Sequence, residues 1–399
     1  MDGSLRQIVG MLAVAMIVAL AARRFKLPYT VGLVIVGAVL ALSKAELGFP
    51  LTHDFIFNLI LPPLLFEAAL NIPWLELRRD NLPILVLSTF GTIVSAGVVA
   101  SGMAWLLGWP TPSALVFGAL IAATDPVAII AMFKDNGVKG RLRLLVESES
   151  LFNDGAAAVL FVMALAWSQS AEHAQTSLET IGTLALIVAG GMTIGAICGG
   201  AALIVAWRTS EHLIEAALTM VAAYGSFLVA EHMHVSGVLA TVTTGLIMAN
   251  FRLLRGKRFL SPRGREFILG FWDFAAFLAN SVVFLLIGVS VAMMPFQSYG
   301  MAVLLTPVVI VLLGRGLTVY PLSLLFLRSR WAISLREQHI LWWGGLRGAL
   351  ALALALSVPP TLPLHQEIVV VTFGVVAFSI VVQGLTMPFL LRRLGFLPK

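Results

Sequence analysis

Long runs of apolar residues, separated by short polar connections, occupy almost the whole chain. Because a helix needs about 20 predominantly apolar residues to cross the hydrocarbon core of a bilayer, these runs predict an all-α membrane protein. We expect about thirteen crossings, at 5–22, 28–43, 53–70, 82–107, 113–132, 143–168, 178–206, 211–230, 235–251, 267–292, 300–327, 336–356 and 365–392.

Composition and charge add an orientation to this picture. Of the 399 residues, 59% are hydrophobic and 12% are charged, so a soluble core could not bury the apolar surface. With these crossings, 22 of the 26 lysines and arginines fall in connections on one side; Arg6 and Lys44 fall on the other, and Arg315 and Arg347 lie within spans. Because basic residues accumulate on the cytoplasmic side, we expect the N-terminus outside and the C-terminus in the cytoplasm. The basic charge does not indicate a nucleic-acid partner.

Two spans at corresponding positions are interrupted. An odd number of spans allows the first six and the last six to form inverted repeats about the seventh, which pairs the fifth span with the twelfth. The fifth contains Thr124-Asp125-Pro126, where proline removes a backbone donor and disfavours helix at the preceding residue. The twelfth contains Gly344-Gly345-Leu346-Arg347-Gly348. Interrupted helices at such positions are typical of a transporter site near the middle of the membrane.

The sixth span supplies further oxygen atoms to this region. On a helix, Ser150 and Asp154 share a face, and Asn153 is adjacent to them. With the Thr124 hydroxyl and carbonyl and the Asp125 carboxylate, they form an all-oxygen set that suits a small monovalent cation better than a transition metal. An uncompensated ionised acid in the membrane costs about 2.5–3.5 kcal/mol. We therefore expect these acids to have a function.

The other buried charges have both structural and functional readings. We expect Glu149, on the neighbouring face of the sixth span, to neutralise Arg347. Glu67, in the third span, is equally a candidate outer ligand and a packing residue. Arg315 and Asp273 are better explained as structural partners or interfacial residues. The single cysteine has no intrachain thiol partner, which excludes a disulfide within the chain.

Three motifs, in their order along the chain, resemble those of the monovalent cation:proton antiporter family, in its NhaP-type and sodium/proton exchanger branch. They are Thr124-Asp125-Pro126-Val127-Ala128, Glu149-Ser150-Leu151-Phe152-Asn153-Asp154 and Gly344-Gly345-Leu346-Arg347-Gly348-Ala349. Leu61-Pro62-Pro63, followed by Phe66-Glu67, also resembles the third span of that family. The similarity covers essentially the whole chain.

The resemblance implies a role for each of these residues. Asp154 would bind cation and proton alternately, Asn153 and Ser150 would complete or support the site, Thr124 would contribute its backbone carbonyl, Asp125 would act directly or through water, and Glu67 would lie at the rim. Sodium would accordingly contact Asp154, Ser150, Thr124 and Glu67. Glu149 and Arg347 match the intramembrane ion pair of the family.

The resemblance also implies an antiporter fold with two crossed discontinuous helices. A dimerisation part would comprise about 1–81 and 207–298, and a mobile core part about 82–168 and 299–399. We expect a homodimer in a prokaryotic inner membrane. The whole chain, 1–399, is expected to be one transmembrane domain without a cytoplasmic regulatory domain.

The predicted function is secondary antiport of Na⁺ or Li⁺ against H⁺ by alternating access. Either ion neutralises a desolvated carboxylate, so competition for one site gives exchange. Because Asn153 stands in place of a second acid, we expect 1:1 electroneutral exchange. A K⁺/H⁺ antiporter of the same fold is the alternative, since these side chains do not distinguish the two cations. We expect neither an enzyme nor a cofactor: the nearest protease-like motif, His234-Val235-Ser236-Gly237, lacks its first glycine.

Overall fold

The computed structural model describes residues 2–25, 28–43, 51–135, 137–169, 177–208, 211–255 and 262–397. Within these ranges the secondary structure is helical and contains no strand, which confirms the all-α prediction. Eight of the described helices are long and apolar enough to cross a membrane. Four shorter apolar helices coincide with four further predicted spans. The twelfth predicted span, 336–356, is divided between two short helices. The count of thirteen crossings stays a prediction.

The chain divides into two compact units. Unit 1 comprises residues 1–56, 82–169 and 280–399, and unit 2 comprises 57–81 and 170–279. Unit 1 thus contains both segments that the resemblance assigns to the core part, but it also contains 1–56 and 280–298, which the resemblance assigns to the dimerisation part. The roles of the two parts in dimerisation and movement stay predictions.

Unit 1 holds most of the described helices. They are α1 (Asp2–Phe25), α2 (Tyr29–Leu42), most of α5 (Asn81–Leu85), η2 (Val86–Phe90), α6 (Gly91–Leu107), α7 (Thr111–Ala122), α8 (Val127–Asp135), α9 (Arg141–Gln169), the C-terminal part of α13 (Pro262–Met293), η3 (Phe296–Ser298), α14 (Met301–Leu324), α15 (Leu335–Trp343), α16 (Ala349–Ser357), α17 (His365–Phe378), η4 (Ser379–Gln383) and α18 (Gly384–Arg393).

The apolar helices of unit 1 pack through small residues. A Cβ added at Gly118 of α7 would lie only 3.1 Å from the Ala100 Cβ of α6, so the two backbones approach closely because this position has no side chain. Without a hydrophobic driving force between helices in lipid, such close van der Waals packing is a main source of helix association. α7 ends four residues further on, at Ala122.

Unit 2 contains most of η1 (Phe55–Ile60), α3 (Leu61–Asn71), α4 (Trp74–Arg79), α10 (Ser177–Ala206), α11 (His212–His232), α12 (Gly237–Arg255) and the N-terminal part of α13. Trp272 of α13 is fully buried, lies 4.6 Å between ring centroids from Phe66 of α3, and donates its indole N–H to Thr219 Oγ1 of α11 at 2.9 Å. The partner matters because a buried polar group without one is costly. These contacts join three helices around one core.

Candidate cation-binding site

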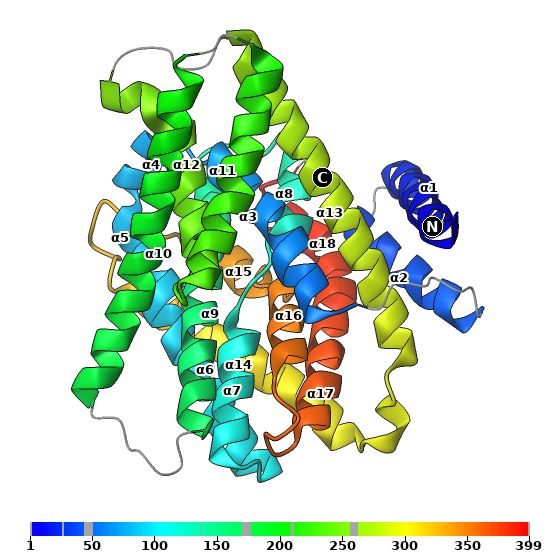
Figure 1. Ribbon diagram of the computed structural model, residues 1–399. Coiled ribbons are helices and arrows are strands. Elements are labelled where there is room, and N and C mark those ends of the chain that lie inside the picture. The colour runs from blue at the N-terminus through cyan, green and yellow to red at the C-terminus, as the bar shows by residue number, and fades with distance from the viewer. Residues whose placement is uncertain are drawn as a thin grey trace. The chain divides into compact units, whose positions relative to one another are not determined.

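Two membrane helices of unit 1 are interrupted, as the sequence predicts. The chain leaves helix at Ala122 and re-enters it at Val127, with Pro126 in the gap (Figure 1). The second helix stops at Trp343 and resumes at Ala349 across the glycine-rich segment 344–348. Each interruption frees backbone N–H and C=O groups, which have no water to bind inside a membrane and need partners from the protein.

The two interruptions meet. The Asp125 N–H donates to the Leu346 carbonyl at 2.8 Å. Gly348 is essential to this approach, because a Cβ added there would lie 2.5 Å from the Asp125 Cβ and 2.6 Å from its Cγ. Only glycine leaves the necessary space at this position. The crossed discontinuous helices expected from the resemblance are therefore joined directly at their breaks.

Arg347 and Asp125 bind unpaired backbone groups at the helix ends on either side of the first interruption. Arg347 Nη1 donates to the carbonyls of Ala122 at 3.2 Å and Ala123 at 3.0 Å, which places a cation at the negative C-terminal end of α7. Asp125 Oδ1 accepts the Val127 N–H at 2.9 Å and so satisfies a free amide in the first turn of α8. Both charges stabilise the interrupted conformation itself.

The interruption faces α9 through Thr124 and Ser150. Thr124 Oγ1 donates to Ser150 Oγ at 3.1 Å, and Ser150 Oγ in turn donates to the Thr124 carbonyl. Both side chains are buried. The structure thus brings together two residues that lie 26 positions apart and that the sequence predicts in one oxygen set.

Asp154 and Asn153 follow on the next turn of the same helix. Among the residues that the structure describes, Asp154 Oδ1 and Asn153 Oδ1 are buried acceptors without a hydrogen-bond donor. The charges of Asp125, Glu149 and Arg347 lie within electrostatic range of the Asp154 carboxylate. A buried acceptor without a donor is costly, and a cation or a proton would satisfy it.

The expected pairing of Glu149 with Arg347 is wrong. The partner of Glu149 is Arg315 of α14, which binds it in a bidentate manner, with Nη1 to Oε1 at 2.7 Å and Nη2 to Oε2 at 2.8 Å. Arg315 also donates through Nε to the Leu341 carbonyl at 3.2 Å, and both charged side chains are buried. Arg347 instead donates from Nη1 to the carbonyls at the end of α7, and its buried Nε has no hydrogen-bond partner among the described residues. The structural role expected for Arg315 is thereby confirmed.

Glu67 belongs to unit 2, whereas the other candidate ligands belong to unit 1. Its Oε1 accepts a hydrogen bond from Asn71 Nδ2 at 2.7 Å, one turn further along α3. Its role as an outer ligand stays a prediction.

Sequence reasoning misses two polar side chains that support the site. Ser379 Oγ accepts the Arg347 N–H at 3.0 Å, and Gln383 Nε2 donates to the Trp343 carbonyl at 2.9 Å. Both belong to η4, a π-helical segment between α17 and α18. The available signal is weak: a serine and a glutamine, four positions apart, in an otherwise apolar stretch of the last predicted span.

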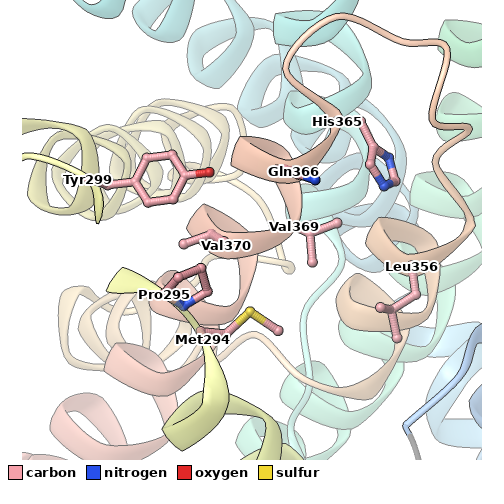
Figure 2. A pocket seen from close by; sticks show the side chains of 8 residues that line it. All are labelled: Met294, Pro295, Tyr299, Leu356, His365, Gln366, Val369 and Val370. Atoms are coloured by element: carbon pink, nitrogen blue, oxygen red, sulfur yellow. The ribbon is translucent and has the colours of Figure 1, made fainter. Parts of the chain in front are cut away.

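A small hollow of unit 1, with a volume of about 10 Å³, is lined by residues of the site, including Thr124, Glu149, Ser150 and Arg315. Figure 2 shows another hollow of unit 1, which is mainly apolar and lies between the start of α17, the end of α16 and the segment after α13. Tyr299 and Gln366 are among its few polar side chains. The two hollows share no lining residue, so the apolar one is separate from the oxygen set.

Discontinuous membrane helices that meet beside buried carboxylates are the arrangement of a secondary ion transporter. Residues 11–393 match the protein family described as "Sodium/hydrogen exchanger, transmembrane". The chain belongs to this family.

Relatives agree with this assignment, and a solved structure shares the fold. The chain is 39% identical to the Na(+)/H(+) antiporter ApNhaP of Aphanothece halophytica over 93% of its own length and 70% of the relative's. It is 34% identical to the Na(+)/H(+) antiporter NhaH of Halobacillus dabanensis over 98% of each chain. The fold matches that of the sodium proton antiporter MjNhaP1 from Methanocaldococcus jannaschii with a TM-score of 0.76 and 19% identity, over 96% of this chain and 99% of that one.

Proposed function

We propose that the protein exchanges Na⁺ for H⁺ across the membrane, with Asp154 as the carboxylate that binds the two ions in turn. The observation that carries this proposal is the pair of buried acceptors, Asp154 Oδ1 and Asn153 Oδ1, which have no donor among the described residues. The Asp154 carboxylate interacts with the backbone N–H of Thr124, at the break between α7 and α8. The printed names of the relatives, Na(+)/H(+) antiporters, support the same reaction.

The donor set fits a small hard cation. The Thr124 carbonyl and hydroxyl, the Ser150 hydroxyl, the Asn153 amide oxygen and the Asp154 carboxylate are all oxygens, which suit Na⁺ and Li⁺. In the described part of the chain, no group of three or more His, Cys, Asp or Glu residues could hold a metal ion. In this proposal Asp125 acts on the site through its charge, which influences Asp154, and through its bond to the Val127 N–H at the start of α8.

Exchange follows from competition for one carboxylate. In a desolvated site Asp154 prefers to be neutral, and either Na⁺ or H⁺ neutralises it. When only the neutralised form changes its accessibility between the two sides, the empty anionic form stays where it is and leak is suppressed. One Na⁺ and one H⁺ leave the moving part with the same charge, so we propose electroneutral 1:1 exchange. The Glu149–Arg315 pair adds no net charge to the site.

Several finer features belong to the same proposal. Li⁺ is a second transported cation, the protein is a homodimer in a prokaryotic inner membrane, and its N-terminus lies outside. The names of the relatives give the alternative cation K⁺ no support. Glu67 is the proposed outer ligand.

The test uses purified protein in liposomes with an acidic interior and a fluorescent ΔpH probe. We expect added Na⁺ or Li⁺ to dissipate the gradient at the same rate with the membrane potential clamped or free. The Asp154→Asn variant, inserted at the same density, is expected to be inactive. A response to K⁺ alone, or full activity of Asp154→Asn, contradicts the proposal.

A further inference from the structure

The π-helical segment η4 lies against the second interruption. It occupies Ser379–Gln383, between α17 and α18. Its first and last residues are polar but are only 1% and 3% exposed. π-helical turns are rare and are frequent at functional sites, so the contacts of these two side chains are informative.

Ser379 and Gln383 hold both ends of the interruption between α15 and α16. Ser379 Oγ accepts the Arg347 N–H at 3.0 Å and lies within hydrogen-bond distance of the Arg347 carbonyl, at 3.2 Å, and of the Val376 carbonyl, at 3.0 Å. Gln383 Nε2 donates to the Trp343 carbonyl at 2.9 Å, where α15 ends. Backbone groups freed by the glycine-rich break are thus satisfied by two side chains from one neighbouring segment.

The same interruption holds the ligand oxygens on its other side. The Leu346 carbonyl accepts the Asp125 N–H, and the Arg347 guanidinium binds the carbonyls of Ala122 and Ala123. The next residue is Thr124, whose hydroxyl and carbonyl both contact Ser150. Hydrogen bonds, together with the Arg347 side chain and the peptide bond from Ala123 to Thr124, therefore link η4 to the oxygen set.

We propose that Ser379 and Gln383 are positioning residues for cation binding. They fix the backbone at 343–347, which fixes the Arg347 guanidinium and, through it, the Thr124 oxygens. Neither side chain contacts the cation. This inference rests on the proposed exchange of Na⁺ for H⁺, and it predicts a loss of cation affinity that exceeds any loss of turnover.

The experiment compares Ser379→Ala and Gln383→Leu with wild type in liposomes. Each removes the hydrogen-bonding group from a buried side chain without adding a charge. We expect the apparent KM for Na⁺ to rise about 3- to 10-fold, the range that corresponds to the net free energy of one hydrogen bond. The maximal rate per folded protein should change less than the KM, and the pH profile should shift because the proton then competes with a more weakly bound cation.

Thr372→Val is the matched control. Thr372 lies on α17, is buried, and donates its hydroxyl to the Ile368 carbonyl of its own helix at 2.6 Å. Removing this hydroxyl leaves the interruption untouched, so the KM for Na⁺ should equal that of wild type. A wild-type KM in a folded Ser379→Ala or Gln383→Leu protein overturns the inference, as does an equal rise in Thr372→Val. Either positioning variant decides the question by itself. Absence of Na⁺-dependent exchange in wild type would instead refute the proposed function.

Discussion

The two interrupted helices of unit 1 break for different reasons, and the backbone groups freed at the two breaks have different partners. At the first, Pro126 stops the helix, and the gap presents the Thr124 oxygens to α9. At the second, a glycine-rich segment stops the helix, and its backbone groups are bound by Ser379 and Gln383. In the proposed function the first interruption offers oxygens to the transported ion, whereas the second supplies Arg347, whose guanidinium binds the end of α7.

The two buried arginines differ in the same manner. Arg315 binds a carboxylate, Glu149, whereas Arg347 binds backbone carbonyls at the end of α7. Two arginines inside one unit therefore serve separate purposes: one closes an ion pair between helices, and the other completes a helix end. The comparison gives four expectations that order the residues by the size and kind of their effects.

Loss of the Asp154 carboxylate should have the largest effect on transport. Asp154→Asn keeps the size of the side chain and removes its charge, so neither Na⁺ nor H⁺ can be bound there in exchange. We expect activity to fall below about 1% of wild type, the scale of a change that removes an essential group, with unchanged thermal stability. Stopped-flow measurement of ΔpH dissipation tests this. Exchange at the wild-type rate in a folded variant is the contrary result.

Breaking the Glu149–Arg315 pair should have the largest effect on stability. Arg315→Leu leaves a buried carboxylate without its partner, which costs about 3–5 kcal/mol. The double variant Glu149→Gln/Arg315→Leu should recover part of this loss. Arg347→Leu should destabilise the protein less, because Glu149 keeps its partner. Thermal unfolding in detergent ranks the stability of these variants. A larger loss of stability in Arg347→Leu than in Arg315→Leu would contradict the assignment of Arg315 as the partner of Glu149.

Gly348→Ala should disturb the contact between the interruptions. The added methyl group overlaps the Asp125 side chain, and overpacking of this kind costs about 1–3 kcal/mol. Because Asp125 must move, the stability should fall and the apparent KM for Na⁺ should rise. Gly270→Ala is a matched control, since a Cβ there has open space around it. Equal behaviour of the two variants would show that the contact has no role.

Two variants of Asp125 should differ by the smallest effect, because they differ only in whether the side chain can accept the Val127 N–H. An asparagine side chain at this position would still accept the Val127 N–H, whereas an alanine side chain would not. Asp125→Ala should therefore cost about 1 kcal/mol more stability than Asp125→Asn. Both variants lose the charge near Asp154, and both should reduce exchange. Identical stability of the two variants in thermal unfolding would mean that the bond to Val127 contributes nothing to the start of α8.

The all-α fold, the two interruptions and the shared helix face of the candidate ligands are predictable from the sequence for identifiable physical reasons. Crossings are visible because lipid requires long apolar runs, and Pro126 and the glycines of 344–348 mark the interruptions. The shared face of Ser150 and Asp154 follows from helical spacing. By contrast, the partner of Glu149 lies 166 positions away on α14. Local spacing cannot choose between two arginines inside the membrane, because that choice depends on which helices are neighbours.

Ser379 and Gln383 show a second limit. Their side chains reach the interruption from η4, which follows a π-helical path, and an apolar sequence pattern with a period of 3.6 does not reveal such a segment. Their task is also invisible in sequence, since it consists in binding a backbone N–H and a backbone carbonyl of residues more than thirty positions away.

The most direct test of a single shared carboxylate is to measure proton release on Na⁺ binding. Purified protein is titrated with Na⁺ by calorimetry near the pH at which the site is protonated, in buffers of different ionisation enthalpy. Competition for one site predicts about one proton released per Na⁺ bound, and neither binding nor release in Asp154→Asn. Sodium binding without proton release, or unchanged release in Asp154→Asn, would contradict the account.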